Sequence, residues 1–254
     1  MYSNKNKKVI YTCITGNYDQ LNNHSYIHPH WDYVCFTDDL SAKNSNNSSW
    51  EIRPLAFNNM DNVRNNRWHK LHPHILFPEY ERSIYVDANI NFISDGLFAD
   101  IDAAVRESRK ISLAPHFSRK CIYDELDACL KFEKDDPDVM KEQIDLIKKD
   151  GFPENYGLFE GNIIYREHHD QDVIKIMRDW WWWIENYSRR DQLSFTYVLW
   201  KNNFRILPLS DIPYRRSKKI SLWTGSKHAT KEELIRRKKI FSELFKKIKK
   251  NNSF

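Results

Sequence analysis

Two oxygen-bearing side chains, Asp87 and Asn89, follow a short apolar run at residues 84–86. Alternate residues of an extended segment point to the same side, so both side chains can face one ligand. In open α/β sheets, ligands bind at the carboxyl ends of the strands. Carboxylate and amide oxygens suit Mg²⁺ or Mn²⁺ that bridges phosphates. The same residues also suit an Asp-x-Asn turn that only ends a strand, and their spacing does not separate the two interpretations.

A basic stripe precedes this run. Arg64, Arg67 and Lys70 recur every three residues in a segment, residues 62–71, that we expect to be helical and to end before Pro73. A narrow stripe beside a phosphate site suits a diphosphate, whereas most charge runs are solvated helix faces. The position of the stripe directly before the acid-tipped strand favours the diphosphate.

The elements expected to position these residues are strands that end in polar side chains. An apolar run at residues 9–15 is closed by a Gly-Asn turn, and a second run at residues 33–37 is followed by two aspartates. The remaining pattern predicts strands at 50–55, 111–114, 161–166 and 204–207, and helices at 95–109, 122–149 with a break near 136–137, 173–187 and through 198–200.

Four consecutive tryptophans, Trp180 to Trp183, occupy every face of one expected helix. Aromatic side chains of this size usually pack in a core. Stacking of an exposed ring on a sugar is the alternative.

Several other functional classes lack their motifs. The chain has no G-x-S-x-G, G-x-x-x-x-G-K-[ST], G-x-G-x-x-G or H-E-x-x-H sequence, and its four cysteines form no C-x-x-C pair. With only 6 glycines, a glycine-lined phosphate loop is hard to build. Phosphate recognition would therefore depend on a metal and basic side chains, which singles out the strand end at Asp87 and the basic stripe.

Composition narrows the class of protein further. Hydrophobic residues make up 41% of the 254 residues, enough for a folded core, and the net charge is +5. This charge suits an enzyme for anionic substrates as well as a nucleic-acid-binding protein, but no nucleic-acid-binding motif is present. Unpaired cysteines, a polar N-terminus and the lack of a long apolar run predict a reduced, cytosolic protein without a membrane span.

The C-terminal segment is different in character. Residues 232–250 are strongly basic, with apolar residues spaced for one helical face. Such a helix is typical of a peripheral anchor on an anionic membrane surface. A terminal helix docked on its own domain fits the same pattern.

Several motifs together resemble a known family. They are Tyr11-Thr12-Cys13-Ile14-Thr15-Gly16-Asn17-Tyr18-Asp19, Tyr33-Val34-Cys35-Phe36-Thr37-Asp38, Arg64-x-x-Arg67-x-x-Lys70, Ser83-Ile84-Tyr85-Val86-Asp87-Ala88-Asn89 and Arg189-Arg190-Asp191-Gln192-Leu193-Ser194-Phe195. In this order, across residues 9–207, they resemble a glycosyltransferase-like family that includes plant mucilage proteins and bacterial polysaccharide-locus proteins.

The resemblance implies an α/β fold of the GT-A-like, Rossmann-like type, with a mixed, mostly parallel central sheet flanked by helices. Residues 1–230 would form one catalytic domain, with a nucleotide-binding half at 9–115 and an acceptor-binding half at 116–230. Residues 231–254 would form the basic C-terminal helix. The chain departs from other GT-A enzymes at Asn89, a neutral ligand where a second aspartate is usual.

The resemblance also implies roles for individual residues in donor and metal binding. Tyr11, Thr12 and Thr15, at the tip of the first strand, would hold the nucleobase and ribose, with Asp38 nearby. Arg64, Arg67 and Lys70 would balance the diphosphate charge. Asp87 and Asn89 would hold Mn²⁺ or Mg²⁺, with His228 as a further metal ligand.

Two acidic residues are candidates for catalysis. Asp191 would be the general base on the acceptor hydroxyl if the enzyme inverts configuration, and would contact the sugar if it retains configuration. An aspartate that caps the helix starting near Gln192 fits the same position. Glu160 is the second candidate for either catalytic role.

These observations predict a glycosyltransferase that is cytosolic and peripheral on the inner face of the membrane. It would move a sugar from a nucleotide-diphosphate sugar to a glycan or a lipid-linked saccharide during surface polysaccharide synthesis, as for lipopolysaccharide or capsule. A non-catalytic nucleotide- or glycan-binding protein that keeps the fold is the first alternative. A basic nucleic-acid-binding protein is the second.

Overall fold

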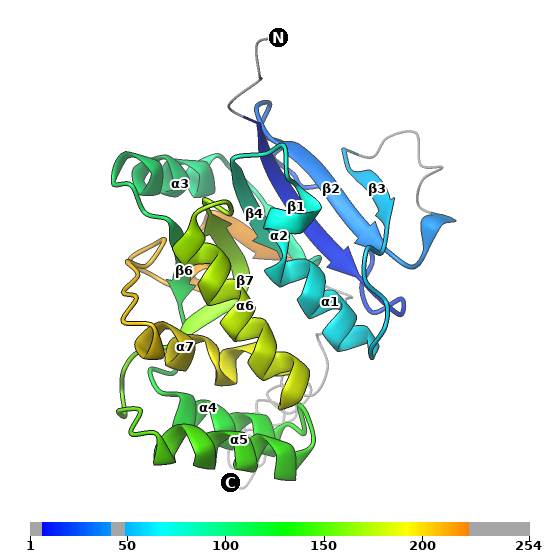
Figure 1. The fold of residues 1–254 in the computed structure, drawn as a ribbon. Coiled ribbons are helices and arrows are strands. Elements are labelled where there is room, and N and C mark those ends of the chain that lie inside the picture. Colours follow the sequence, from blue (N-terminus) through cyan, green and yellow to red (C-terminus); the bar gives the residue numbers. More distant parts are fainter. Residues whose placement is uncertain (1–6, 42–48, 224–254) are drawn as a thin grey trace, which may run out of the picture.

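The first strand, β1 (Lys8–Ile14), is buried over nearly its whole length, as expected of a central parallel strand. It lies in a six-stranded sheet of order β3-β2-β1-β4-β7-β6 in the computed structural model, which describes residues 7–41 and 49–223 (Figure 1). The other strands are β2 (Asp32–Thr37), β3 (Glu51–Pro54), β4 (Arg82–Val86), β6 (Ile111–Pro115) and β7 (Phe159–Arg166).

Most strands of the sheet are parallel. β1 pairs in parallel with both β2 and β4, and β3 pairs in parallel with β2, whereas β7 runs antiparallel to its neighbours β4 and β6. The mixed α/β class with a mostly parallel sheet is therefore confirmed. Because β1, β2 and β4 run the same way, their carboxyl ends share one edge of the sheet, as the polar strand ends predict.

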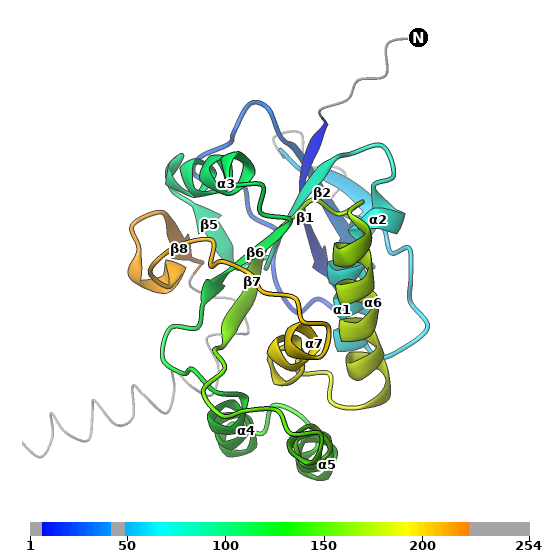
Figure 2. The ribbon, with the colours of Figure 1, turned by 60° about the vertical axis from the view of Figure 1, so that its left-hand side comes forward.

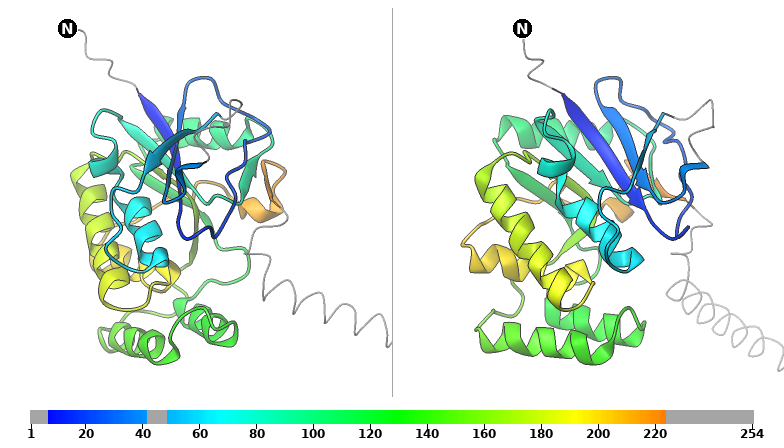
Figure 3. Two further views of the ribbon diagram at one scale, coloured as in Figure 1. Left: turned by 90° about the vertical axis from the view of Figure 1, so that its right-hand side faces the viewer. Right: turned by 45° about the vertical axis from the view of Figure 1, so that its right-hand side comes forward.

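Helices cover both faces of the sheet. α1 (Asn62–Leu71) and α6 (Gln171–Asn186) run side by side on one face, together with the short helix α2 (Pro73–Leu76), and α3 (Gly96–Arg106) lies on the other (Figures 2 and 3). Alternate residues of β1 enter the two cores: Tyr11 packs on the α1 side, whereas Ile10 and Ile14 pack on the α3 side.

Two further helices, α4 (Ile122–Lys131) and α5 (Pro137–Lys149), lie together beyond the carboxyl end of the sheet, and α7 (Phe195–Lys201) packs next to α6 (Figure 1). Asp61, Asp136 and Asp170 accept hydrogen bonds from the first backbone N–H groups of α1, α5 and α6. α1 ends before Pro73, as predicted, and Pro73 then begins α2.

The tryptophans divide between the core and the surface. Trp180 and Trp181 are buried, whereas Trp182 is 48% exposed. The Trp180 ring lies 4.2 Å from the Phe195 ring, centroid to centroid. Trp183 is partly buried and packs against the same core, so core packing accounts for all of the run except Trp182.

Several elements differ from the predictions. A small sheet of β5 (Ile90–Phe92) and β8 (Ile220–Leu222) was not expected. The predicted strand at 204–207 is wrong: the segment runs beside β6, where the carbonyl of Leu207 accepts a bond from Ser112 Oγ, but it forms no regular ladder. Pro208 follows directly and has no N–H to donate, which prevents regular pairing.

The two expected halves of the chain share this one sheet, because β7 from the second half pairs between β4 and β6 from the first. His228 and the basic segment at 231–254 lie outside the described residues. Within the described residues, no helix has the length and apolar character that a membrane span requires. All four cysteines are buried and free.

Candidate functional site

Asp87 occupies the carboxyl end of β4, next to the start of β7. Its backbone N–H donates to Asn162 O at 2.9 Å, and its carbonyl accepts from Ile90 N at 3.0 Å. The side chains of Asp87 and Asn89 are partly exposed. This turn therefore both ends the strand and holds two oxygen-bearing side chains at the ligand-binding edge of the sheet. Trp223, the last described residue, donates its N–H to Asn89 O at 2.8 Å.

The three residues of the predicted basic stripe contact two different parts of the protein. Arg64 donates from Nε to Ile184 O at 2.9 Å and from Nη2 to Tyr187 O at 2.6 Å, so its guanidinium caps the C-terminal end of α6. Residues six positions apart on a helix point about 120° away from each other, so Arg64 and Lys70 meet different neighbours. These partners do not support the predicted contact of Arg64 with a diphosphate.

Arg67 and Lys70 converge on Asp191 instead. Lys70 Nζ lies 2.5 Å from Asp191 Oδ2, and Arg67 Nε lies 3.3 Å from the same oxygen. Gly161 of β7 closes this group from the sheet side. A Cβ at Gly161 would stand 2.8 Å from Lys70 Nζ and 3.1 Å from Asp191 Oδ2, so this position leaves no room for a side chain.

The environment of Asp191 makes it a poor proton acceptor. Burial alone raises the pKa of Asp191, but the charges of Arg67, Lys70 and Arg190 outweigh it and hold the pKa well below its usual range. Its Oδ1 accepts from Gln192 N at 3.1 Å, and its carbonyl accepts from Trp180 Nε1 at 2.9 Å. Asp191 is therefore a fixed counter-ion, and the expected role as general base does not fit this environment.

Glu160, at the start of β7, has the opposite character. Its side chain is 3% exposed, Oε2 accepts from Asn162 Nδ2 at 3.1 Å, and Oε1 lies 3.3 Å from Arg215 Nε. Burial raises the pKa of Glu160 above its usual value, and the charge of Asp87 adds to the rise, although Arg215 and Asn162 lower it. A carboxyl whose pKa is raised by burial is typical of groups that accept or donate a proton in catalysis.

Two predicted donor contacts lie inside the sheet. Tyr11 and Thr12 are fully buried in the middle of β1, not at its tip, because the strand continues to Ile14. The hydroxyl of Tyr11 donates to Lys70 O at 2.8 Å and accepts from Arg166 Nη2 at 2.5 Å. Direct contact of these two residues with a nucleobase is therefore a wrong prediction.

The other two predicted donor residues lie at the expected edge of the sheet. Thr15 follows β1, and its Oγ1 donates to Asn62 O, the first residue of α1, at 2.7 Å. Asp38 follows β2, is exposed and accepts from Gly16 N at 2.7 Å. Gly16 has a φ of +61°, the left-handed conformation that its turn requires.

Three residues near this centre were missed by the sequence analysis. Tyr18 is 45% exposed, and burial of part of its ring raises its pKa, on which the charges of Arg190 and Asp87 also act. Arg190 precedes Asp191 in the sequence, which could have drawn attention to it. Arg215 reaches Glu160 from a short helical turn near the end of the described chain, and no sequence signal indicated it.

The oxygen ligands at Asp87 and Asn89 suit a hard divalent cation, but the protein supplies few of them. Within residues 7–41 and 49–223, no three His, Cys, Asp or Glu side chains form a metal-binding group. Mg²⁺ is commonly held by one or two carboxylates together with the phosphates of its substrate. The residues at this strand end fit that kind of site, with Asp87 as its one carboxylate.

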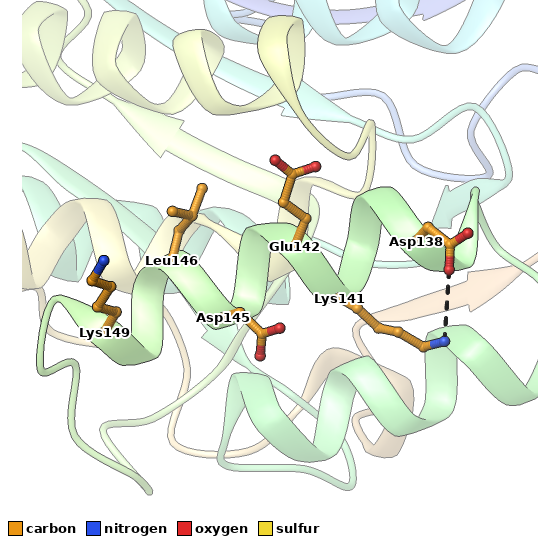
Figure 4. Close-up of a pocket in the computed structure, with 6 residues that line it drawn as sticks. All are labelled: Asp138, Lys141, Glu142, Asp145, Leu146 and Lys149. Atoms are coloured by element: carbon orange, nitrogen blue, oxygen red, sulfur yellow. Dashed lines mark ion pairs between the residues drawn. The ribbon is translucent and has the colours of Figure 1, made fainter.

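A shallow pocket on the surface of α5 is separate from these residues. It is lined by Asp138, Lys141, Glu142, Asp145, Leu146 and Lys149 (Figure 4). None of the predicted site residues contributes to it.

Comparison with protein families gives one match. The model of the TOD1/MUCI70, glycosyltransferase-like domain matches residues 1–216. No curated protein matches the chain in sequence.

Three solved structures illustrate the similarity in fold. The bifunctional glycosyltransferase WbbM in its apo form is 13% identical over 82% of this chain and 40% of its own, with a TM-score of 0.45. Mouse xyloside xylosyltransferase 1 in its apo form is 11% identical over 80% and 85%, with a TM-score of 0.46. The galactosyltransferase LgtC in complex with donor and acceptor sugar analogs is 12% identical over 78% and 70%, with a TM-score of 0.42.

Proposed function

Because the chain belongs to the TOD1/MUCI70 glycosyltransferase-like family, we propose that it transfers a sugar from a nucleotide-diphosphate sugar to a saccharide acceptor. The observation that carries the proposal is the convergence at the end of β4. The charge of Asp87 acts there on Arg67 and Lys70, which meet Asp191, and on the buried carboxyl of Glu160.

The cation-rich group is suited to a diphosphate. Arg67, Lys70 and Arg190 all act on the carboxylate of Asp191, so three fixed cations gather around it. Fixed positive charge stabilises the negative charge that develops on a departing diphosphate, and it needs no reorganisation during the reaction. In this proposal Arg67 keeps the phosphate-binding role, and Lys70, whose side chain is 2% exposed, contributes its charge without direct contact. Thr15 and Asp38 lie on the nucleoside side.

A divalent cation would be held by Asp87 and Asn89. When bound, Mn²⁺ or Mg²⁺ supplies Lewis-acid stabilisation of the diphosphate. His228 comes five positions after Trp223, whose N–H is bonded to Asn89 O. That position supports His228 as a third ligand.

Glu160 takes the catalytic role in preference to Asp191. In an inverting transfer, Glu160 accepts the proton of the acceptor hydroxyl while the hydroxyl oxygen bonds to the anomeric carbon. The bond from that carbon to the diphosphate breaks, and the diphosphate leaves with the electron pair. A carboxyl whose pKa is raised is a better proton acceptor than one whose pKa is lowered. In a retaining transfer, Glu160 would contact the sugar.

The finer features of the proposal rest on sequence patterns. The acceptor is a glycan or lipid-linked saccharide of a surface polysaccharide, and the protein works in the cytoplasm, with residues 232–254 on an anionic membrane surface. The support is the resemblance and the basic amphipathic pattern of the tail. Loss of liposome binding on deletion of 232–254, with an unchanged melting temperature, tests the membrane contact, and unchanged binding refutes it.

A non-catalytic nucleotide- or glycan-binding protein is the second candidate, and Asn89 in place of a second carboxylate favours it. A thermal-shift panel of UDP, GDP, CDP and their sugars, with and without Mn²⁺, tests donor binding. Stabilisation by one nucleotide that grows with Mn²⁺ supports the donor site. If none of these compounds shifts the melting temperature, both the transferase and the non-catalytic nucleotide-binding protein are contradicted.

A further inference from the structure

Arg166, the last residue of β7, is a fully buried cation at the opposite end of that strand from Glu160. Its Nη1 donates to Lys70 O at 2.7 Å, and its Nη2 donates to Tyr11 Oη at 2.5 Å. Nη1 also lies 3.3 Å from Met177 Sδ of α6, and the guanidinium lies 5.8 Å from the centre of the Tyr11 ring. No carboxylate within the described ranges forms an ion pair with it.

A buried guanidinium without a carboxylate partner is costly. Removal of the charge from water disfavours it, and burial lowers the pKa of Arg166. Its Nε has no hydrogen-bond partner among the described residues. An apolar side chain of similar volume would fill this space at lower cost. The contacts that Arg166 does make therefore indicate what the charge is used for.

Those contacts converge on the end of α1. Lys70 lies in the last turn of α1, where carbonyl groups have no partner within the helix. Its carbonyl accepts from both Arg166 and the Tyr11 hydroxyl. A positive charge is also favourable at this end of a helix, because the helix dipole is negative there. The end of α1 is thereby tied to β1 and β7 at the residue whose Nζ meets Asp191.

We infer that Arg166 and the Tyr11 hydroxyl form a clamp that positions Lys70, so that its ammonium group stands beside Asp191 at the donor diphosphate. The diphosphate part of this inference rests on the proposed function. Arg166 contacts no reacting group and is a positioning residue. The clamp also gives a use to Tyr11, which lies too deep in β1 to touch a nucleobase.

The clamp makes a prediction about the accessibility of Lys70. Its side chain is 2% exposed, whereas that of Lys141 on α5 is 55% exposed. Acetylation of the folded chain with sulfosuccinimidyl acetate, followed by peptide mass spectrometry, measures the labelling rate of each lysine. We expect Arg166→Met to raise the rate of Lys70 relative to Lys141 by about tenfold, since a charge-assisted hydrogen bond is lost. Tyr11→Phe should raise it by about threefold, since a neutral hydrogen bond is lost.

Two controls separate positioning from a general loss of stability. Ile101→Ala opens the core on the opposite face of the sheet, and should lower the melting temperature without raising the labelling of Lys70. Arg82→Met removes a partly exposed cation from the strand next to Arg166, and should leave Lys70 protected. Equal labelling of Lys70 in Ile101→Ala and Arg166→Met at equal stability would overturn the inference.

The experiment remains decisive if Arg166→Met does not fold, because Tyr11→Phe deletes only one oxygen and tests the same clamp. Unchanged Lys70 labelling in folded Tyr11→Phe and Arg166→Met proteins overturns the inference. The labelling needs no donor. A chain without transferase activity but with the expected labelling therefore refutes the proposed function and leaves the clamp intact.

Discussion

Lys70 and Asp191 are 121 positions apart in the sequence, and Lys70 Nζ lies 2.5 Å from Asp191 Oδ2. The contact joins α1 to the turn before α7 across the start of β7. It neutralises one of the two cations that α1 brings to the site, at a position where the charge of Asp87 also acts on Lys70. The position of the site therefore depends on a buried ion pair as well as on the end of a strand.

Asp191→Asn should destabilise the fold strongly. It leaves the buried charge of Lys70 without its counter-ion, and removal of one partner of a buried pair costs about 3 kcal/mol. Urea unfolding at neutral pH measures the loss. Asp138→Asn is the matched control, because the side chain of Asp138 is 92% exposed in its pair with Lys141. Equal stability of the two variants would contradict the importance of the buried pair.

The stabilising effect of Asp191 should depend on pH. Its pKa in the folded chain is lowered, so the folded state binds fewer protons at this group than the unfolded state does. Its contribution is complete above the unfolded pKa of about 4 and is lost as the pH falls through the lowered folded pKa. The stability difference between wild type and Asp191→Asn should shrink as the pH falls below about 4. If the stability difference between wild type and Asp191→Asn stays constant in acid, the pKa of Asp191 is not lowered in the folded chain.

Glu160→Gln should change the stability of the fold in the opposite direction to Asp191→Asn. The folded pKa of Glu160 is raised, so its ionised form destabilises the fold as the pH rises through that pKa. The amide removes this cost, so the variant should melt at a higher temperature than wild type at about pH 8 and at a similar temperature at about pH 5. Differential scanning calorimetry measures both. A lower melting temperature for the variant at both values would show that the carboxylate of Glu160 is stabilised by its partners.

Arg64→Ala and Arg67→Ala should separate the two parts of the basic stripe. Arg64 caps α6, so its loss should cost about 1–2 kcal/mol of stability and leave the affinity for a nucleotide diphosphate unchanged. Loss of Arg67 removes a cation beside Asp191 and should weaken that affinity about tenfold or more. Calorimetric titration with the nucleotide found in the thermal-shift panel measures both variants. If Arg64→Ala and Arg67→Ala weaken the affinity for the nucleotide diphosphate equally, both arginines contact the diphosphate and the division of the basic stripe is wrong.

Much of the fold could be predicted because its elements are long and strongly patterned. The buried runs of β1, β2 and β4, and the break between α4 and α5, are direct consequences of apolar periodicity and proline. β5 and β8 have three residues each and pair with each other across 130 positions, as between Asn91 and Ser221, so neither has a local signal. The segment at 204–207 has the apolar pattern of a strand, but Pro208 prevents the pairing that would complete it.

The site could be predicted in part. The position of Asp87 follows from local sequence, because a strand that ends in acidic residues carries its own signal. Local sequence does not predict the partners of Arg64, Lys70 and Asp191, because these partners depend on which helix lies beside α1. A spacing of three residues also does not keep side chains on one line over two turns of a helix. Tyr11 and Thr12 were assigned to the tip of β1 although both lie inside the strand, whose last residue is Ile14.

Donor hydrolysis by purified wild type and Asp87→Ala tests the central claim most directly. With the nucleotide sugar selected by the thermal-shift panel and Mn²⁺ present, wild type should release the nucleoside diphosphate. Asp87→Ala should be at least about a hundredfold slower while keeping its melting temperature, since the carboxylate that would hold the divalent cation at the leaving diphosphate is lost. Asp138→Asn, on the surface of α5, should match wild type. Equal hydrolysis by wild type and Asp87→Ala, or none by wild type with any donor, would contradict the account.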